Sequence, residues 1–322
     1  MKRLIATAMT AAYVFGAAVG SGIANERVAR AELLRTLVTV PLPGEPTNLA
    51  LADGSLWMSV PAEAILLRID ARSGRRLARI RVTDQDRRAF GGGAVAAWRG
   101  IIWVAAPVHV DDDPSLPPKN SGWIGRLDTR TGQMRIAFVN GDPPVAIAAG
   151  PAGVWVSGGK TLRRIDPRSG RSVASASLLH RLGDVAVGAN RVWVAAPGAG
   201  MVLGVDPRRR RVVNKIVTGP TSSNGSLALE RLLWAATDSG VVAVDPRRSR
   251  VVARVPVPRA QGIAVDNSAV WIYAPRGLYS VDAGIATRRF APPAPAFGAV
   301  AARQGRIWIS DSVTRTLWRV GP

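Results

Sequence analysis

The stretches RSVASASLL at residues 171–179 and GDVAVGANRVWVAA at residues 183–196 contain the pattern that decides the fold. They hold three short runs of β-favouring residues, and turn-forming residues separate these runs, which is typical of successive antiparallel strands. The last run carries a tryptophan preceded by valine. A tryptophan preceded by Leu, Ile or Val recurs along the whole chain, at Trp57, Trp103, Trp155, Trp193, Trp234, Trp271 and Trp308. The sequence therefore contains seven related units.

An aspartate after an apolar residue follows each of the first six tryptophans, at Asp70, Asp128, Asp166, Asp206, Asp245 and Asp282. In strings such as RIDPRSG, the aspartate can accept hydrogen bonds from backbone amides and the glycine can adopt a positive φ, so a tight turn is expected. Each unit then holds four strands, A to D, with the tryptophan on strand B and the aspartate at the end of strand C. Units of about 40 residues with four strands predict an all-β, seven-bladed β-propeller of four-stranded antiparallel blades.

The seventh unit contains Trp308 and a third strand, TLWRV at 316–320, but no fourth strand. Residues 33–43, LLRTLVTVPLP, resemble the strand D segments RVVNKIVTG at 211–219 and RVVARVPVP at 250–258. Pairing residues 33–43 with the last three strands would remove two exposed sheet edges. We therefore expect the ring to be closed by an N-terminal strand that completes the last blade.

Residues 1–24 begin with Met-Lys-Arg and continue with an apolar stretch, which is typical of a signal peptide or a membrane anchor. Cleavage is expected after Ala24 or after Ala31. We expect residues 25–32 to be a linker, residues 33–322 to form the propeller, and the protein to be extracytoplasmic, either secreted or anchored. The chain contains no cysteine, so no disulfide can stabilise it.

The formal net charge is +21, and arginines of the C–D turns should form a basic rim on one face. This basic rim is either a plain solvated surface or a surface that contacts an anionic envelope polymer or lipid. Nucleic acid is not expected as a partner because aromatic residues do not interleave with the arginines. We expect a monomer. The polyanion candidates are Arg208, Arg209, Arg210, Arg211, Arg247 and Arg248.

The D–A and B–C loops share the opposite face, which should be acidic and should carry the ligand site. The longest departure from the repeat, VHVDDDPSLPPKNSG at 108–122, falls in one of these loops. Its carboxylates could bind Mg²⁺ or Ca²⁺, although a plain acidic loop is the alternative and no resident cofactor or metal is predicted. The candidate ligand-binding residues are Asp84, Asp86, His109, Asp111, Asp112, Asp113, His180 and Asp184.

The WVAA-type strands, the D-P-R-S-G turns and the V-x-x-P corners after strand D resemble those of YVTN or YncE-type propellers and of streptogramin (virginiamycin B) lyases. For the lyases, the resemblance implies histidines and a glutamate near the central channel, acting with magnesium. The strand A openings of this chain contain neither: they read PTNLA, GGAVA, PVAIA, LGDVA, NGSLA, QGIAV and FGAVA. We therefore predict an exported, non-enzymatic binding or scaffold propeller of unknown ligand. The alternative is a lyase-like enzyme with a degenerate or displaced site that uses Asp184 and His180.

Overall fold

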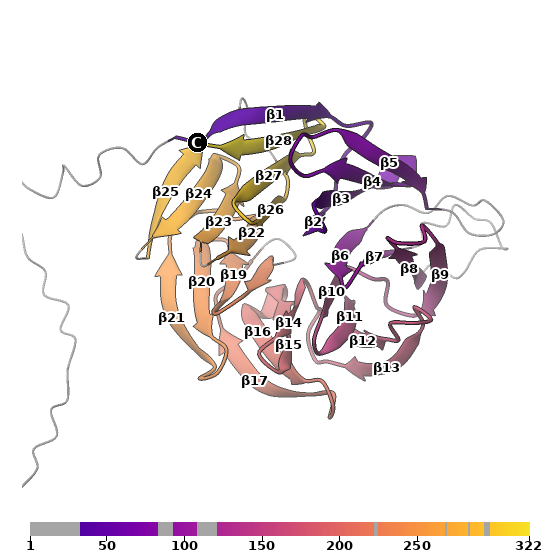
Figure 1. Cartoon of the computed structure of the whole chain (residues 1–322). Coiled ribbons are helices and arrows are strands. Elements are labelled where there is room, and N and C mark those ends of the chain that lie inside the picture. The colour runs from indigo at the N-terminus through magenta and orange to yellow at the C-terminus, as the bar shows by residue number, and fades with distance from the viewer. Residues whose placement is uncertain are drawn as a thin grey trace, which may run out of the picture. The chain divides into compact units, whose positions relative to one another are not determined.

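The computed structural model describes residues 33–82, 93–107, 121–221, 225–267, 269–282, 284–292 and 297–322. These residues form seven antiparallel sheets of four strands each, which are arranged as blades around a central channel (Figure 1). The predicted fold class is confirmed. The predicted leader and linker lie outside the described residues, and no helix within the described ranges is long and apolar enough to cross a membrane.

The first four blades run in chain order from the innermost strand to the outermost strand. Blade 1 contains β2 (Leu49–Ala52), β3 (Ser55–Val60), β4 (Ile65–Asp70) and β5 (Arg76–Arg81). Blade 2 contains β6 (Ala94–Trp98), β7 (Ile101–Pro107), β8 (Ser121–Asp128) and β9 (Met134–Asn140). Blade 3 contains β10 (Ala146–Gly150), β11 (Gly153–Gly158), β12 (Thr161–Ile165) and β13 (Ser172–Ser177). Blade 4 contains β14 (Val185–Gly188), β15 (Arg191–Ala196), β16 (Met201–Asp206) and β17 (Arg211–Val217).

The remaining blades follow the same order, except that the last one takes its outer strand from the start of the propeller. Blade 5 contains β18 (Leu227–Leu229), β19 (Leu233–Thr237), β20 (Gly240–Asp245) and β21 (Arg250–Val255). Blade 6 contains β22 (Gly262–Asp266), β23 (Ala269–Ala274), β24 (Gly277–Asp282) and β25 (Ile285–Phe290). Blade 7 contains β26 (Val300–Arg303), β27 (Arg306–Asp311), β28 (Thr316–Gly321) and β1 (Arg35–Pro41). Two 3-10 turns, η1 (Pro61–Glu63) and η2 (Pro197–Ala199), lie in the B–C connections of blades 1 and 4.

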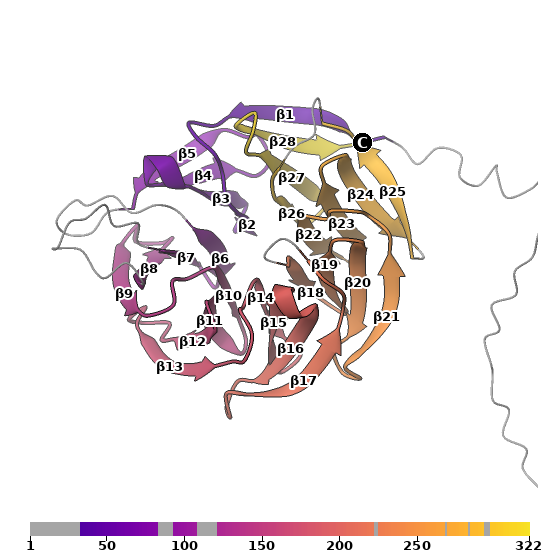
Figure 2. The same cartoon turned by 180° about the vertical axis from the view of Figure 1, so that it is seen from behind.

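Ring closure occurs where β1 pairs with β28, with Val40 opposite Leu317 and Thr39 opposite Trp318 (Figures 1 and 2). The segment before β1 also binds the neighbouring blade 6, because the amide of Leu34 donates to the carbonyl of Arg289 at 2.7 Å. The expected closure by an N-terminal strand is confirmed. It gives β28 a partner and removes an open edge from the ring.

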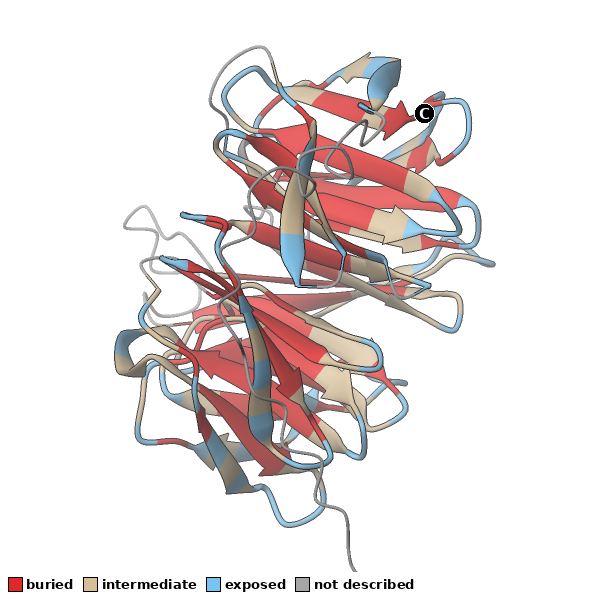
Figure 3. Ribbon diagram, turned by 90° about the vertical axis from the view of Figure 1, so that its left-hand side faces the viewer, coloured by how far each residue is buried: buried red, intermediate tan, exposed pale blue. Residues whose placement is uncertain are grey.

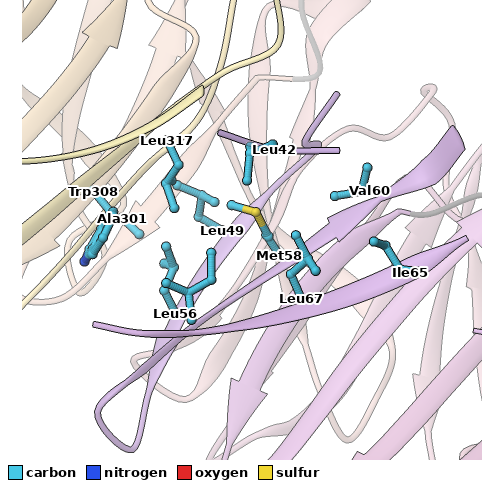
Figure 4. Close-up of a cluster of buried hydrophobic side chains, with 11 residues drawn as sticks. Leu42, Leu49, Leu56, Met58, Val60, Ile65, Leu67, Ala301, Trp308 and Leu317 are labelled. Carbon is cyan, nitrogen blue, oxygen red and sulfur yellow. The ribbon is translucent and has the colours of Figure 1, made fainter. Parts of the chain in front are cut away.

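The repeat tryptophans pack between neighbouring blades. At the junction of blades 7 and 1, Trp308 is fully buried beside Leu56, and its indole Nε1 donates to the carbonyl of Ala71 at 3.1 Å (Figure 4). Six of the seven repeat tryptophans are at most 8% exposed, and Trp271 is half-buried. They are core residues, and no ligand needs to be invoked for them.

The C–D turns have the predicted geometry. In blade 3, Oδ1 of Asp166 accepts the backbone amides of Arg168 and Ser169, and Gly170 follows with φ +74°. Asp70, Asp128, Asp206 and Asp245 make the same pair of amide contacts in their own turns. Burial falls from the inner strands to the outer ones, whose residues alternate between exposed and half-buried (Figure 3).

Candidate functional site

All seven blades contribute to a cavity of ≈ 540 Å³ where the innermost strands begin, at one mouth of the central channel. Its wall is built from the residues that open strand A in each blade. Most of them are Gly, Ala, Val, Leu or Ile, and the polar ones are Thr47, Asn48, Asp184, Ser226 and Gln261. Because the seven sheets converge here, the site depends on the ring and not on any single blade.

A β-bulge shapes the start of strand A. In blade 4, the amide of Gly183 donates to the carbonyl of Ala195, and the amide of Ala195 donates to the carbonyl of Asp184, so two residues face one. Close backbone approach accompanies this geometry: a Cβ placed on Gly93 or on Gly298 would collide with the carbonyl oxygen of Ala105 or of Ser310. The glycines at these openings therefore allow strand B to lie against the bulge.

Among the described residues that line this cavity, Asp184 is the only one with a titratable side chain. Its Oδ1 accepts the amide of Val185 and its Oδ2 accepts the amide of Leu227 in the next blade, both at 2.8 Å. Burial raises the pKa of the Asp184 carboxyl to about 6, and the two amide hydrogen bonds, which favour the carboxylate, limit the rise. Asp184 is therefore a half-buried acid with a raised pKa, and no described residue on the cavity wall is a cation.

Other polar wall residues make similar bonds between blades. Ser226 Oγ accepts the amide of Ile263 at 3.2 Å, at the position in blade 5 that corresponds to Asp184 in blade 4. Gln261 Oε1 accepts the amide of Gly298 at 3.2 Å, and Thr47 Oγ1 donates to the carbonyl of Gly93 at 3.0 Å. Sequence reasoning missed these residues, although aligning the strand A openings shows them as polar exceptions in a pattern of small and apolar residues.

Within the described residues, the strand A openings of blades 1, 2, 3 and 7 lack side-chain hydrogen bonds at the position that corresponds to Asp184. Asn48 Oδ1 is buried and has no hydrogen-bond partner in the described structure. The corresponding positions in blades 2, 3 and 7 are Ala94, Ala146 and Ala299, whose side chains offer no acceptor to a neighbouring blade. A buried polar atom without a partner costs free energy unless water or a ligand reaches it.

Most of the predicted ligand residues cannot be located relative to this cavity. Asp84, Asp86, His109, Asp111, Asp112 and Asp113 lie outside the described residues. His180 is half-buried in the connection between β13 and β14, and it is not among the residues that line the cavity with Asp184. Within the described ranges no group of three or more His, Cys, Asp or Glu side chains could hold a metal ion.

The polyanion candidates are all exposed. Arg208, Arg209, Arg210 and Arg211 follow the turn aspartate of blade 4, and Arg247 and Arg248 follow that of blade 5. Arg248 Nη1 lies 3.3 Å from Asp245 Oδ2 in a solvent-exposed ion pair, which contributes little to stability.

The described residues thus define a seven-bladed β-propeller with a cavity of small-molecule size at the mouth of its channel. No family model and no curated protein matches the chain. The fold is similar to the β-propeller domain of Cps50 (Swd1) from Myceliophteria thermophila, with 11% identity, a TM-score of 0.70, and coverage of 90% of this chain and 99% of that one. BamB from Moraxella catarrhalis is also similar, with 11% identity, a TM-score of 0.59, and coverage of 90% and 100%. Identities this low show the fold alone.

Proposed function

We propose that this protein is an exported, non-enzymatic binding propeller whose ligand occupies the mouth of the central channel, on the face formed by the D–A and B–C loops. The observation that carries this proposal is the cavity of ≈ 540 Å³ lined by all seven blades with one carboxylate, Asp184, in its wall. Pockets for small molecules are commonly about 300–1,000 Å³, mostly apolar, with few polar groups that orient the ligand. Asp184 is the orienting group.

The chemistry of the wall indicates the class of ligand. None of the described residues that line the cavity is a lysine or an arginine, and Asp184 accepts its two hydrogen bonds from backbone amides. A carboxylate has about four lone-pair sites, so two remain for a ligand. The complementary molecule is small, carries a positive charge or a hydrogen-bond donor for Asp184, and presents apolar surface to side chains such as Val95 and Ile147.

Extracytoplasmic placement is the part of the proposal that rests on the sequence of residues 1–24. Fusing residues 1–32 to an enzyme that is active only outside the cytoplasm gives activity if the segment directs export. A fusion that stays inactive and cytoplasmic contradicts it. Contact of the exposed arginine rim with an anionic envelope polymer or lipid would then be a second, non-specific role, and it should weaken steeply with salt.

Choline and its uncharged analogue 3,3-dimethyl-1-butanol test the binding site because they share their shape and differ in charge. We expect saturation-transfer NMR to detect choline on the wild-type protein and to lose most of that signal with Asp184→Asn. Asp282→Asn, which removes an exposed carboxylate at the end of β24, is the matched control and should leave the signal unchanged. If the wild-type protein gave equal signals with both compounds, or if Asp184→Asn and Asp282→Asn gave equal signals with choline, Asp184 would be excluded as the orienting group.

The raised pKa of Asp184 is the one observation that favours the lyase-like alternative, since a carboxyl with a pKa near 6 can accept and release protons at neutral pH. Incubating the protein with magnesium and a cyclic depsipeptide streptogramin distinguishes the two. The binding proposal expects the cyclic compound to remain intact. A linear product formed by the wild-type protein and not by Asp184→Asn would replace binding with catalysis.

A further inference from the structure

Arg163 on β12 occupies a position that is uncharged in every other blade. In each blade this position on strand C lies opposite the residue that follows the repeat tryptophan on strand B. In blade 3, Arg163 lies opposite Val156. In the other blades it is filled by Leu67, Gly125, Leu203, Val242, Tyr279 and Trp318. Arg163 is 5% exposed. A charged side chain at one core position of a repeat breaks the pattern at a cost to stability, which is typical of functional positions.

The guanidinium of Arg163 is only partly satisfied. Nη2 donates to the carbonyl of Asn140 at 3.1 Å, while Nη1 is buried and has no hydrogen-bond partner in the described structure. Burial lowers the pKa of the Arg163 guanidinium, and the nearby carboxylate of Asp142 opposes the shift. Asp142 forms no ion pair with Arg163, and its Oδ2 accepts the amide of Lys160 and the hydroxyl of Thr161. Arg163 is therefore a buried cation without a direct counter-charge.

This side chain lines a cavity of ≈ 600 Å³ between β9, the outer strand of blade 2, and β12 and β13 of blade 3. Figure 1 shows these strands beside one another at the outer side of the ring. We name it the Arg163 notch, and its polar lining residues are Asn140, Thr161, Arg163, Arg171, Ser172 and Ser175. It is separate from the central cavity and shares no lining residue with it.

The polar groups of the notch match an oxyanion. Arg171, Ser172 and Ser175 are exposed on one side of the notch, and Arg163 lies at its buried side. Two arginines line the notch, and none of its described lining residues is an aspartate or a glutamate. Arginine forks and hydroxyl groups together offer donors in several directions, which suits a group with three or four oxygens better than a single carboxylate.

We propose that the Arg163 notch binds a phosphate group, with Arg163 and Arg171 as the charged donors and the hydroxyls of Ser172 and Ser175 as further donors. The phosphate supplies the counter-charge that Arg163 lacks. This site differs from the exposed arginine rim, because it includes the buried guanidinium of Arg163, whereas an exposed rim attracts any polyanion and loses it as salt screens the charges.

Inorganic phosphate is the probe, titrated calorimetrically into the full-length protein at constant ionic strength. The variants are Arg163→Gln and Arg171→Gln, and the matched control is Arg164→Gln. Arg164 is the next residue, is exposed, loses the same charge, and lines a different cavity between blades 3 and 4. We expect Arg163→Gln and Arg171→Gln each to weaken phosphate binding by about tenfold or more, and Arg164→Gln to change it by less than about twofold.

No heat of binding with the wild-type protein, or an equal loss in all three variants, would overturn the proposal. Circular dichroism establishes that each variant is folded. Because the Arg171 side chain is exposed, Arg171→Gln keeps the test decisive even if Arg163→Gln unfolds. A parallel measurement with phosphatidylglycerol vesicles identifies the source: binding that needs Arg163 indicates a lipid headgroup, and binding unaffected by Arg163→Gln indicates free phosphate as the ligand.

Discussion

The carboxylate of Asp184 in blade 4 accepts the backbone amide of Leu227 in blade 5 at 2.8 Å, so one wall residue of the channel also joins two blades. Its position couples the candidate ligand site to the stability of the ring. Protonation changes both, because it removes the cost of a buried charge and leaves a neutral acid that no longer attracts a cation.

Asp184→Asn should flatten the dependence of stability on pH. The folded-state pKa of about 6 exceeds the unfolded value of about 3.9, so the folded protein binds more protons between these values. The contribution of Asp184 to stability is thus fully present below about pH 4 and is lost as the pH rises through about 6. The loss is on the order of 2 kcal/mol, reduced by any water in the cavity.

Urea unfolding at several values of pH measures this effect. The difference in unfolding free energy between the wild-type protein and Asp184→Asn should change across that window, on top of a constant offset for the hydrogen bond that the amide side chain cannot accept. Asp282→Asn serves as the control for loss of an exposed carboxylate. A difference that stays constant with pH would show that Asp184 titrates normally.

The C–D turn aspartates change the dependence of stability on pH in the opposite direction to Asp184. Hydrogen bonds from Ser169, first from its backbone amide and then from its hydroxyl, lower the pKa of Asp166, so its contribution is present above the unfolded pKa and is lost as the pH falls through the folded one. Asp166→Ala should lower the urea midpoint at neutral pH and have a smaller effect in acid. Arg168→Ala keeps the backbone donor and should be nearly neutral. Equal effects of the two variants would contradict a role for the carboxylate.

Deleting residues 33–43 should destabilise the whole ring and not only blade 7. The deletion removes β1, exposes the edge of β28, and uncovers Val38 and Val40, which pack against the cluster that contains Trp308. We expect one cooperative unfolding transition at a much lower temperature, measured by calorimetry. The protein lacking residues 1–24 is the control and should unfold like the full chain. Two separate transitions would show that the blades do not depend on closure.

Arg163→Leu tests whether Arg163 is kept for binding at the expense of stability. Leucine fills the same position in blades 1 and 4, as Leu67 and Leu203. Replacing a buried, poorly paired charge with a well-packed apolar group should leave the unfolding free energy unchanged or raise it by about 1–3 kcal/mol. A loss of more than about 3 kcal/mol would identify Arg163 as a structural anchor through Asn140 and Asp142.

The fold followed from the sequence because the repeat tryptophan recurs seven times and the turn aspartate six times. The tryptophan of strand B and the turn aspartate have one physical task each, and repetition separates that task from chance. The closing strand was also predictable, since residues 33–43 carry the strand D pattern that the last unit lacks. The site was harder to predict. Asp184 was among the candidates, but its contact with Leu227 joins residues 43 positions apart in different blades.

Arg163 was missed for a different reason. It stands beside Arg164 in a chain with 43 lysines and arginines, and one exposed and one buried arginine look alike in sequence. Aligning strand C of the blades gives the signal, because only blade 3 places a charge where the others have an uncharged residue. Deviations from a repeat are therefore more informative about function here than the repeat itself.

The preference of the protein for choline over 3,3-dimethyl-1-butanol, measured by NMR at about pH 7.5 and about pH 4.5, tests binding at the channel mouth most directly. Choline keeps its charge at both values, so any change comes from the protein. We predict that choline is preferred at the higher pH, that the preference disappears at the lower pH, and that Asp184→Asn shows none at either. No preference at the higher pH, or a preference that Asp184→Asn retains, would contradict the assignment of this cavity as a ligand site oriented by Asp184.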